Sequence, residues 1–191
     1  VLIGVTGTDG KTTTCNFIYQ ILKSAGIKAG MISTVNAQIG DEVLDTGFHV
    51  TTPEAPAVQY YLWKMKEAGI THVVLETTSH GLAQQRVTGC DFDIAVVTNI
   101  THEHLDYHGS YEEYLHTKGI LFQSLTKTPL KPFFINRIGV INKDDQSFGY
   151  LKEICDASQI HYSLMSTEDI WAEDIRFEAE GICFTAIGKN F

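Results

Sequence analysis

The sequence is poor in proline and has no long hydrophobic run. Only 4 of its 191 residues are proline and 16 are glycine, which argues against a disordered chain and against a proline-rich linker. No apolar run reaches the roughly 18 residues that a membrane-spanning helix needs. A chain of this length can bury roughly 70% of its unfolded surface, so we expect one globular domain.

The sequence also lacks an initiator methionine and a signal peptide. It opens at Val1, directly in an apolar run. We therefore expect a piece of a longer protein.

Positive charge is scarce. Lys and Arg number 14 against 23 Asp and Glu, which gives a formal net charge of −9. An acidic domain without a basic block is poorly suited to bind nucleic acid or a membrane surface. We expect neither as a partner, and a phosphate ligand would have to be held by a local arrangement.

The cysteines show no pairing pattern. They form no C-x-x-C motif, they have no zinc-type spacing with histidine, and they stand at Cys15, Cys90, Cys155 and Cys183. Dispersed cysteines favour a reducing compartment, so we expect a cytoplasmic protein. They also favour four small buried apolar side chains over a metal or redox role.

Short apolar segments alternate with segments of helical periodicity. Continuous apolar runs are typical of parallel strands that are covered on both faces. The alternation predicts an α/β fold, a P-loop NTPase-like, mostly parallel sheet flanked by helices, with a small antiparallel hairpin towards the C-terminus. We expect strands at 1–5, 28–34, 72–76, 94–98 and 139–142, helices at 11–25, 53–69, 111–125 and 146–155, a hairpin or long loop at 36–49, and a hairpin at 170–187.

Local signals mark where several helices begin and end. Thr52, followed by Pro53, has the features of an N-cap residue. Ser110 and Glu113 have the spacing of a capping box. Gly26 stands where a helix-terminating glycine is expected.

A glycine-rich segment separates the first expected strand from the first expected helix. Residues 6–13 read TGTDGKTT, which fits a relaxed phosphate-binding loop in which Val5 replaces the first glycine of the strict motif. Glycines let backbone N–H groups turn towards phosphate oxygens, and the following helix adds its positive end. Lys11 would reach the β- and γ-phosphates, and the Thr12 hydroxyl would bind Mg²⁺. The alternative is a glycine-rich turn with a solvated lysine.

Polar side chains gather where the expected strands end. Ligands of open parallel sheets bind at the carboxyl ends of the strands, and the polar segments there are 8–12, 76–80, 99–108 and 142–145. Glu76 ends an apolar strand, where a carboxylate is costly unless it is paired or bound to metal. It would be a further Mg²⁺ ligand, the alternative being a solvated carboxylate.

A histidine-rich segment follows the strand expected at 94–98. Its His102, His104 and His108 lack the standard spacing of zinc ligands. A role for one of these histidines beside Mg²⁺ or phosphate is favoured over a zinc site that catalyses hydrolysis. Lys118, on the next expected helix, is predicted from composition alone to be solvated.

Together these segments resemble the Mur ligase family, specifically its central ATPase domain. The resemblance covers residues 1–145 and is carried, in order, by TGTDGKTT (6–13), TTPEA (51–55), ETTSHGLAQQRV (76–87), TNITHEHLDYHG (98–109), Lys118 and INKDD (141–145). Within the family, the TTP, SHGL and HLDYHG segments are most similar to those of the UDP-N-acetylmuramoyl-tripeptide synthetases.

The resemblance implies an ATP-dependent amide-bond ligase that uses ATP and Mg²⁺. Such an enzyme adds the third amino acid to UDP-MurNAc-L-Ala-D-Glu in peptidoglycan precursor synthesis. The substrate carboxylate attacks the γ-phosphate to give an acyl phosphate, and the incoming amine then displaces phosphate. The partners implied are the UDP-muramoyl dipeptide and an amino acid, bound by a monomeric, cytoplasmic enzyme.

The resemblance also implies a set of site residues. Those implied to hold ATP are Gly7, Thr8, Asp9, Gly10, Lys11, Thr12, Thr13, Asn142 and Asp145. Those implied to hold the UDP-muramoyl dipeptide are Thr51, Thr52, Thr78, Ser79, Gln84 and Arg86. Thr12 and Glu76 would bind one Mg²⁺, and His104 and Lys118, the latter as a carbamate, would bind a second. The catalytic residues implied are Lys11, Glu76, His104 and Lys118.

The sequence departs from the family pattern at a few positions. Asp9 stands where the family usually has Asn, Thr77 where it has Val, His102 where Arg is common, and Glu103 where Asp is usual. We expect residues 1–191 to be the central ATP-binding domain of a Mur ligase, whose uridine-binding and amino-acid-binding domains lie outside this chain. These 191 residues alone are expected not to complete ligation.

Other functions compete with this interpretation. A folylpolyglutamate synthase or a cyanophycin-type ligase would share the phosphate loop and the modified lysine. A P-loop nucleotide-binding module without ligation belongs to a different class, and so does a metal hydrolase built on the histidine-rich segment. The sequence does not indicate which amino acid is added.

Overall fold

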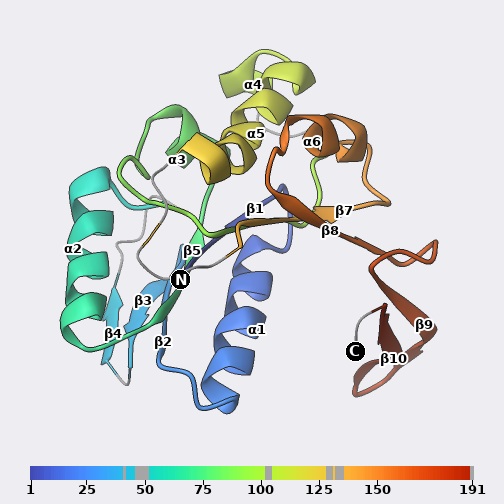
Figure 1. The fold of residues 1–191 in the computed structure, drawn as a ribbon, viewed down its shortest axis with the longest axis horizontal. Coiled ribbons are helices and arrows are strands. Elements are labelled where there is room, and N and C mark those ends of the chain that lie inside the picture. The colour runs from blue at the N-terminus through green and yellow to red at the C-terminus, as the bar shows by residue number, and fades with distance from the viewer. Residues whose placement is uncertain (41, 46–51, 102–104, 128–130, 132–135, 190–191) are drawn as a thin grey trace.

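The computed structural model describes residues 1–40, 42–45, 52–101, 105–127, 131 and 136–189. Within these residues, ten strands form one sheet that is flanked by six helices (Figure 1). The strands are β1 (Leu2–Thr6), β2 (Ala29–Ile32), β3 (Asn36–Ile39), β4 (Glu42–Asp45), β5 (His72–Glu76), β6 (Ile94–Val97), β7 (Ile138–Asn142), β8 (Ser158–Ser163), β9 (Ile170–Glu178) and β10 (Gly181–Gly188). The helices are α1 (Lys11–Ser24), α2 (Ala55–Glu67), α3 (Ser79–Ala83), α4 (Leu105–His108), α5 (Tyr111–Lys127) and α6 (Phe148–Ile154). No helix in this described part of the chain is long and apolar enough to span a membrane.

The sheet is parallel at its centre and antiparallel at its edges. Its strand order is β10-β9-β8-β7-β6-β1-β5-β2-β3-β4. β1 pairs in parallel with β5 and β6, so that Val5 lies opposite both Glu76 and Val96. Antiparallel pairs extend the sheet through β3 and β4 at one edge and join β9 to β10 at the other. The predicted α/β fold and its C-terminal hairpin are confirmed.

Each face of the sheet carries its own hydrophobic core. Side chains alternate along β1. Leu2 therefore lies in the core between the sheet and α2, α5 and α6, whereas Ile3 and Val5 lie in the core between the sheet and α1. In Figure 1, α3 to α6 gather above the sheet and α1 runs below it. The carboxyl ends of β1, β5 and β6 therefore lie next to the start of α1 and next to α5.

A close approach between β1 and α5 depends on Gly4. A Cβ atom at this position would lie 2.8 Å from Leu121 on α5 and 2.8 Å from Phe92. Such distances are shorter than side chains tolerate, so a larger residue would push α5 away from β1. The glycine thus sets α5, which carries Lys118, close to the end of β1.

The structure corrects several local expectations. α2 begins after Glu54, which is its N-cap, so Thr52 is not the helix cap that the sequence predicts. The elements α3, α4 and β8 were not predicted. Cys183 is exposed, whereas the other three cysteines are buried as expected. Burial raises the pKa of Cys90 to about 11, in keeping with an inert side chain.

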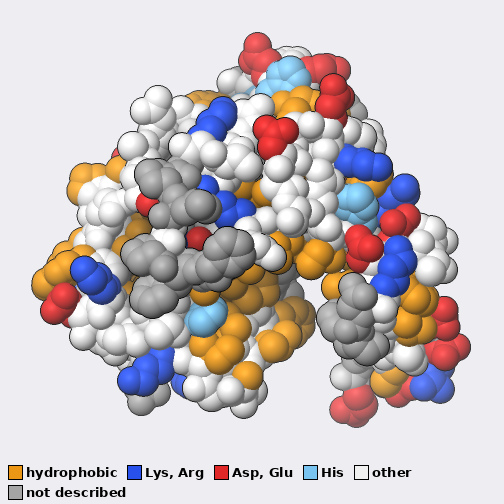
Figure 2. Space-filling model, in the orientation of Figure 1, with side chains coloured by type: hydrophobic (Ala, Val, Ile, Leu, Met, Phe, Trp, Pro, Cys, Tyr) orange, Lys and Arg blue, Asp and Glu red, His pale blue; other side chains and the backbone are white. Residues whose placement is uncertain are grey.

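The C-terminal hairpin projects from the body of the molecule (Figure 2). Phe177 and Phe184 on this hairpin are 82% and 59% exposed. A groove of about 490 Å³ opens beside α1, and Ile18, Val96 and Tyr162 contribute to its lining. The molecule therefore presents apolar surface on the hairpin and along the α1 side of the sheet.

Candidate functional site at the carboxyl ends of the strands

The phosphate loop connects β1 to α1 and depends on two glycines. Gly10 has φ 75° and is the N-cap of α1, without a side chain to cap the first N–H groups of the helix. Gly7 has φ 150°, and a Cβ atom there would lie 1.8 Å from Thr98 Oγ1. The first turn of α1 thus offers its backbone donors to an anion. The Lys11 ammonium lies over this loop and donates to the Thr8 carbonyl at 2.6 Å.

A buried carboxylate lies directly beside this loop. Glu76 is 1% exposed. Its Oε2 atom accepts from Thr12 Oγ1 at 2.9 Å and from the Thr34 N–H at 3.1 Å. Carboxylate and hydroxyl oxygens are the ligands that Mg²⁺ prefers. The pair therefore fits a magnesium ion at the edge of a phosphate site.

Lys118 reaches the loop from the other side. Its side chain is 1% exposed, and Nζ donates to the Gly7 carbonyl at 2.7 Å. Nζ also lies 4.5 Å from the ring centroid of Tyr114. The solvated lysine predicted from composition is wrong, because the packing of α5 against β1 places this side chain in the interior.

A second group of expected site residues lies next to Glu76. Thr52 Oγ1 accepts from the Thr78 N–H at 3.1 Å and donates to the Glu76 carbonyl at 3.2 Å. Thr78 is the N-cap of α3 and accepts from the Gly81 N–H at 3.0 Å. A Cβ atom at Gly81 would lie 2.7 Å from Thr52. Thr52 thus joins the segment before α2 to the start of α3.

The guanidinium of Arg86 is held by neighbouring acceptors. Its Nε and Nη2 atoms donate to Gln84 Oε1 at 2.9 and 2.6 Å, and Nη1 donates to the Thr52 carbonyl at 2.7 Å. Nη2 also forms an ion pair with Glu54 at 3.1 Å. Gln84 Nε2 in turn donates to the Tyr107 hydroxyl at 3.2 Å. Sequence reasoning did not single out Tyr107, although it stands in the HLDYHG segment.

The remaining expected residues are distributed as follows. Asp9 and Thr13 are exposed, Thr8 is 5% exposed, and Ser79 on α3 is 2% exposed. Asn142 and Asp145 bind the backbone of residues 98–100. Thr51 and His104 lie outside the described residues, as do His102 and Glu103. The structure thus brings the loop, Glu76, Lys118, Thr52, Thr78, Gln84 and Arg86 to one end of the sheet.

The fold and this site together define a P-loop α/β domain. The chain belongs to the Mur ligase middle-domain family, whose model matches residues 5–191. Family membership rests on nearly the whole chain, including the C-terminal hairpin that the resemblance in the sequence did not cover.

Similar proteins agree with this assignment. The UDP-N-acetylmuramoyl-L-alanyl-D-glutamate–2,6-diaminopimelate ligase of Geobacillus kaustophilus is 43% identical over 185 residues, which cover 96% of this chain and 37% of the relative. A solved structure of a ligase of the same name has a TM-score of 0.83 at 31% identity and covers 98% of this chain and 37% of its own. The folylpolyglutamate synthase of Mycobacterium tuberculosis shares the fold, with a TM-score of 0.68 at 12% identity over 97% of this chain and 47% of its own. The chain spans a little over a third of the length of the curated relative.

Proposed function

We propose that residues 1–191 are the central ATP-binding domain of an ATP-dependent ligase. The ligase adds the third amino acid to UDP-MurNAc-L-Ala-D-Glu in peptidoglycan precursor synthesis. The observation that carries the proposal is the position of Glu76, which binds the loop residue Thr12 through its carboxylate and the Thr52 hydroxyl through its carbonyl. One residue thus connects the side chains expected to hold ATP with those expected to hold the muramoyl dipeptide.

The phosphate loop would bind the triphosphate of ATP. Backbone N–H groups at the start of α1, from Gly10 to Thr13, would contact phosphate oxygens, and Lys11 would turn from the Thr8 carbonyl to neutralise charge on the γ-phosphate. The dipeptide carboxylate attacks this phosphorus and releases ADP. Phosphoryl transfer depends mostly on such positioning and neutralisation.

Thr12 and Glu76 are the residues that would hold a first Mg²⁺, which would supply positive charge beside the phosphates. The oxygen donors of this pair fit that ion. His104 and Lys118, the latter as a carbamate, would hold a second ion. Carbamylation of a lysine replaces a cation by an anionic oxygen ligand, and the buried Nζ atom of Lys118 lies at the loop, where such a ligand is needed.

The substrate side would be formed by Thr51, Thr52, Thr78, Ser79, Gln84 and Arg86. The planar fork of Arg86 is suited to carboxylate or phosphate groups. Its present partner Glu54 is 69% exposed on the side chain. A substrate acid could therefore take the place of Glu54 at little cost.

The compartment and assembly follow from the same proposal. Three buried free thiols suit a reducing environment, so we place the enzyme in the cytoplasm. We further propose that it acts as a monomer whose partners are ATP, the muramoyl dipeptide and an amino acid.

The test is phosphate release by the full-length protein from Mg-ATP. UDP-MurNAc-L-Ala-D-Glu is supplied with and without each of a panel of amino acids that includes diaminopimelate and lysine. Release that requires both the dipeptide and one amino acid is expected, and it identifies that amino acid. Release that requires folate and glutamate instead would point to the folylpolyglutamate synthases, and release without any acceptor would contradict ligation.

A further inference from the structure

The segment that follows β6 contacts the phosphate loop through both backbone and side chains. The Thr8 N–H donates to the Asn99 carbonyl at 2.7 Å. The Asn99 side chain forms two hydrogen bonds with the backbone of Asp9. Its Oδ1 atom accepts from the Asp9 N–H at 3.1 Å, and its Nδ2 atom donates to the Asp9 carbonyl at 3.3 Å. Thr98 Oγ1 donates to the same carbonyl at 2.6 Å. The tip of the loop is thus fixed by Thr98 and Asn99.

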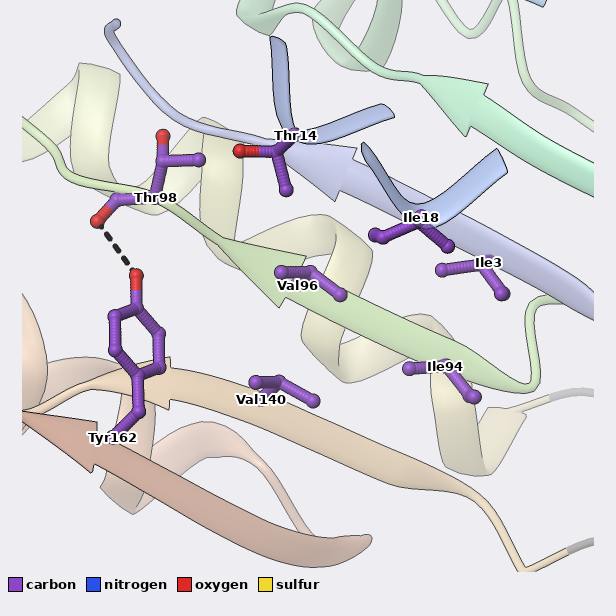
Figure 3. A pocket seen from close by; sticks show the side chains of 8 residues that line it. All are labelled: Ile3, Thr14, Ile18, Ile94, Val96, Thr98, Val140 and Tyr162. Carbon is purple, nitrogen blue, oxygen red and sulfur yellow. Dashed lines mark hydrogen bonds between the residues drawn. The ribbon is translucent and has the colours of Figure 1, made fainter. Parts of the chain in front are cut away.

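Two side chains, Asn142 on β7 and Tyr162 on β8, donate hydrogen bonds to the backbone of this segment. Asn142 Nδ2 and the Tyr162 hydroxyl donate to the Thr98 carbonyl at 2.8 and 3.0 Å, and Tyr162 also donates to the Val97 carbonyl at 2.9 Å. Figure 3 shows the Tyr162 hydroxyl aimed at Thr98 across the groove. Burial, followed by the nearby carboxylates of Asp145 and Asp144, raises the pKa of Tyr162 well above its usual value, so the hydroxyl remains a donor. Both supporting side chains are half-buried, and they come from two adjacent strands.

Such support matters because of the loop's composition. Gly7 and Gly10 adopt conformations that only glycine reaches easily, and glycines lose the most backbone entropy when they are ordered. A loop that is ordered before it meets its ligand leaves less of this entropy to be lost on binding. Thr98 also fills the space above Gly7, where a Cβ atom would clash with its hydroxyl.

We propose that Thr98 and Asn99 are positioning residues that hold the phosphate loop in its anion-binding conformation, and that Asn142 and Tyr162 act on the loop through them. The inference rests on the proposed function, because it assigns a role in nucleotide binding. It gives Asn142 a different role from the direct contact with ATP that the resemblance implies. Asp9 then contributes its backbone to the loop, and its exposed carboxylate is free to point away from the phosphates.

The test compares nucleotide affinity among variants of the full-length protein. Mg-ADP and Mg-ATP are titrated by calorimetry into the wild type and into Asn99→Ala, Thr98→Ala and Thr98→Ser. Loss of two backbone-directed hydrogen bonds in Asn99→Ala is expected to weaken nucleotide binding roughly tenfold. Thr98→Ala is expected to weaken binding about fivefold, and Thr98→Ser to restore it to within about twofold of the wild type. The KM for the muramoyl dipeptide is expected to stay unchanged.

Gln159 provides a matched control. Its side-chain amide also donates to two backbone carbonyls, those of Lys152 and Cys155 at 3.0 and 2.8 Å. It lies at the start of β8, at the opposite end of the strands from the loop. Gln159→Ala is expected to lower the melting temperature about as much as Asn99→Ala without changing nucleotide affinity.

Equal Mg-ADP affinity in the wild type, Asn99→Ala and Thr98→Ala, with only a lower melting temperature, would overturn the inference alone. Failure of the wild type to bind either nucleotide would overturn the proposed function, and the inference with it. If Asn99→Ala does not fold, the comparison of Thr98→Ala with Thr98→Ser decides the question.

Discussion

Glu76 and Asp93 are two buried carboxylates at opposite ends of the central strands, since Glu76 ends β5 and Asp93 directly precedes β6. Glu76 is 1% exposed and accepts from Thr12 on the phosphate loop. Asp93 is 2% exposed and accepts from the Leu2 N–H and from Lys131. A buried carboxylate is costly unless it is paired, so each must have a specific partner. Lys131 is the partner of Asp93. Among the described residues, the Glu76 carboxylate accepts from two neutral donors, the Thr12 hydroxyl and the Thr34 N–H, an arrangement that suits a metal ligand.

Glu76→Gln is therefore expected to impair the response to magnesium. The amide keeps the size of the side chain but removes the charge, and we expect Mg-ATP-dependent phosphate release to fall by about 100-fold or more. A magnesium titration of the full-length enzyme measures the change. Asp93→Asn is the control, with an expected loss of roughly 1–3 kcal/mol in the free energy of unfolding and a normal magnesium response. A normal magnesium response in Glu76→Gln would contradict the proposed role of Glu76 as a metal ligand.

Lys118 offers a test of the carbamate proposed for its side chain. Lys118→Ala is expected to lose most of the activity, and short-chain carboxylates such as acetate are expected to restore part of it by supplying the missing oxygen ligand. The assay is phosphate release with and without added acetate or, as a control, methylammonium. Unchanged activity, or rescue by the amine instead, would contradict a carbamate at this position.

At the residue scale, sequence reasoning identified the groups that follow directly from local pattern. Lys11 and Thr12 stand in a loop motif, and Glu76 ends an apolar strand, so their proximity follows from the rule for parallel sheets. Lys118 did not follow from composition, because its burial depends on how α5 packs against a distant strand. The positions of Thr98 and Asn99 at a strand end were visible, but their hydrogen bonds to Asp9 were not.

At the element scale, the contact between α5 and α6 depends on a glycine. A Cβ atom at Gly119 would lie 2.6 Å from Ile154 and 3.0 Å from Tyr150, both on α6. Gly149, also on α6, has no heavy atom within 4 Å of the corresponding position. Both glycines are helical, but Gly119 is closely packed, whereas Gly149 has open space around it.

Alanine at these two positions is expected to have effects of opposite sign. Gly119→Ala forces α5 and α6 apart and is expected to lower the free energy of unfolding by about 1–3 kcal/mol. Gly149→Ala restricts the unfolded chain without a clash and is expected to raise it by roughly 0.4–1 kcal/mol. Urea denaturation of both variants measures these changes. A destabilised Gly149→Ala beside an unaffected Gly119→Ala would contradict the observed packing.

Elements with clear local sequence signals were predicted correctly, whereas those set by contacts between distant residues were not. β5 was predicted at its observed bounds because its apolar run ends sharply at Glu76. The capping interaction predicted for Ser110 is present, since the Glu113 N–H donates to its hydroxyl at 3.1 Å. The start of α2 was misplaced because the Thr52 hydroxyl binds Glu76 and Thr78, which lie far away in the sequence. β8 was missed because its residues are short of apolar character and its place is set by pairing with β7.

At the scale of the whole molecule, alternation of strands and helices was enough to predict an α/β fold. The order of the strands was not, since β1 lies between β5 and β6 although it precedes both by many residues. That order is what brings the loop after β1 beside the end of β5 and the end of β6. The site is thus a product of topology, and we propose that this topology serves acyl-phosphate formation.

Transfer of ¹⁸O from the dipeptide carboxylate to the released phosphate tests acyl-phosphate formation most directly. UDP-MurNAc-L-Ala-D-Glu labelled with ¹⁸O in the carboxylate that is ligated is incubated with the full-length enzyme, Mg-ATP and the accepted amino acid. The carboxylate oxygen that attacks the γ-phosphate stays with phosphorus when the amine breaks the C–O bond, so the released phosphate is predicted to contain one ¹⁸O atom. The isotope shift in the ³¹P NMR spectrum measures it. Amide formation with unlabelled phosphate would contradict an acyl phosphate and with it the function proposed for this site.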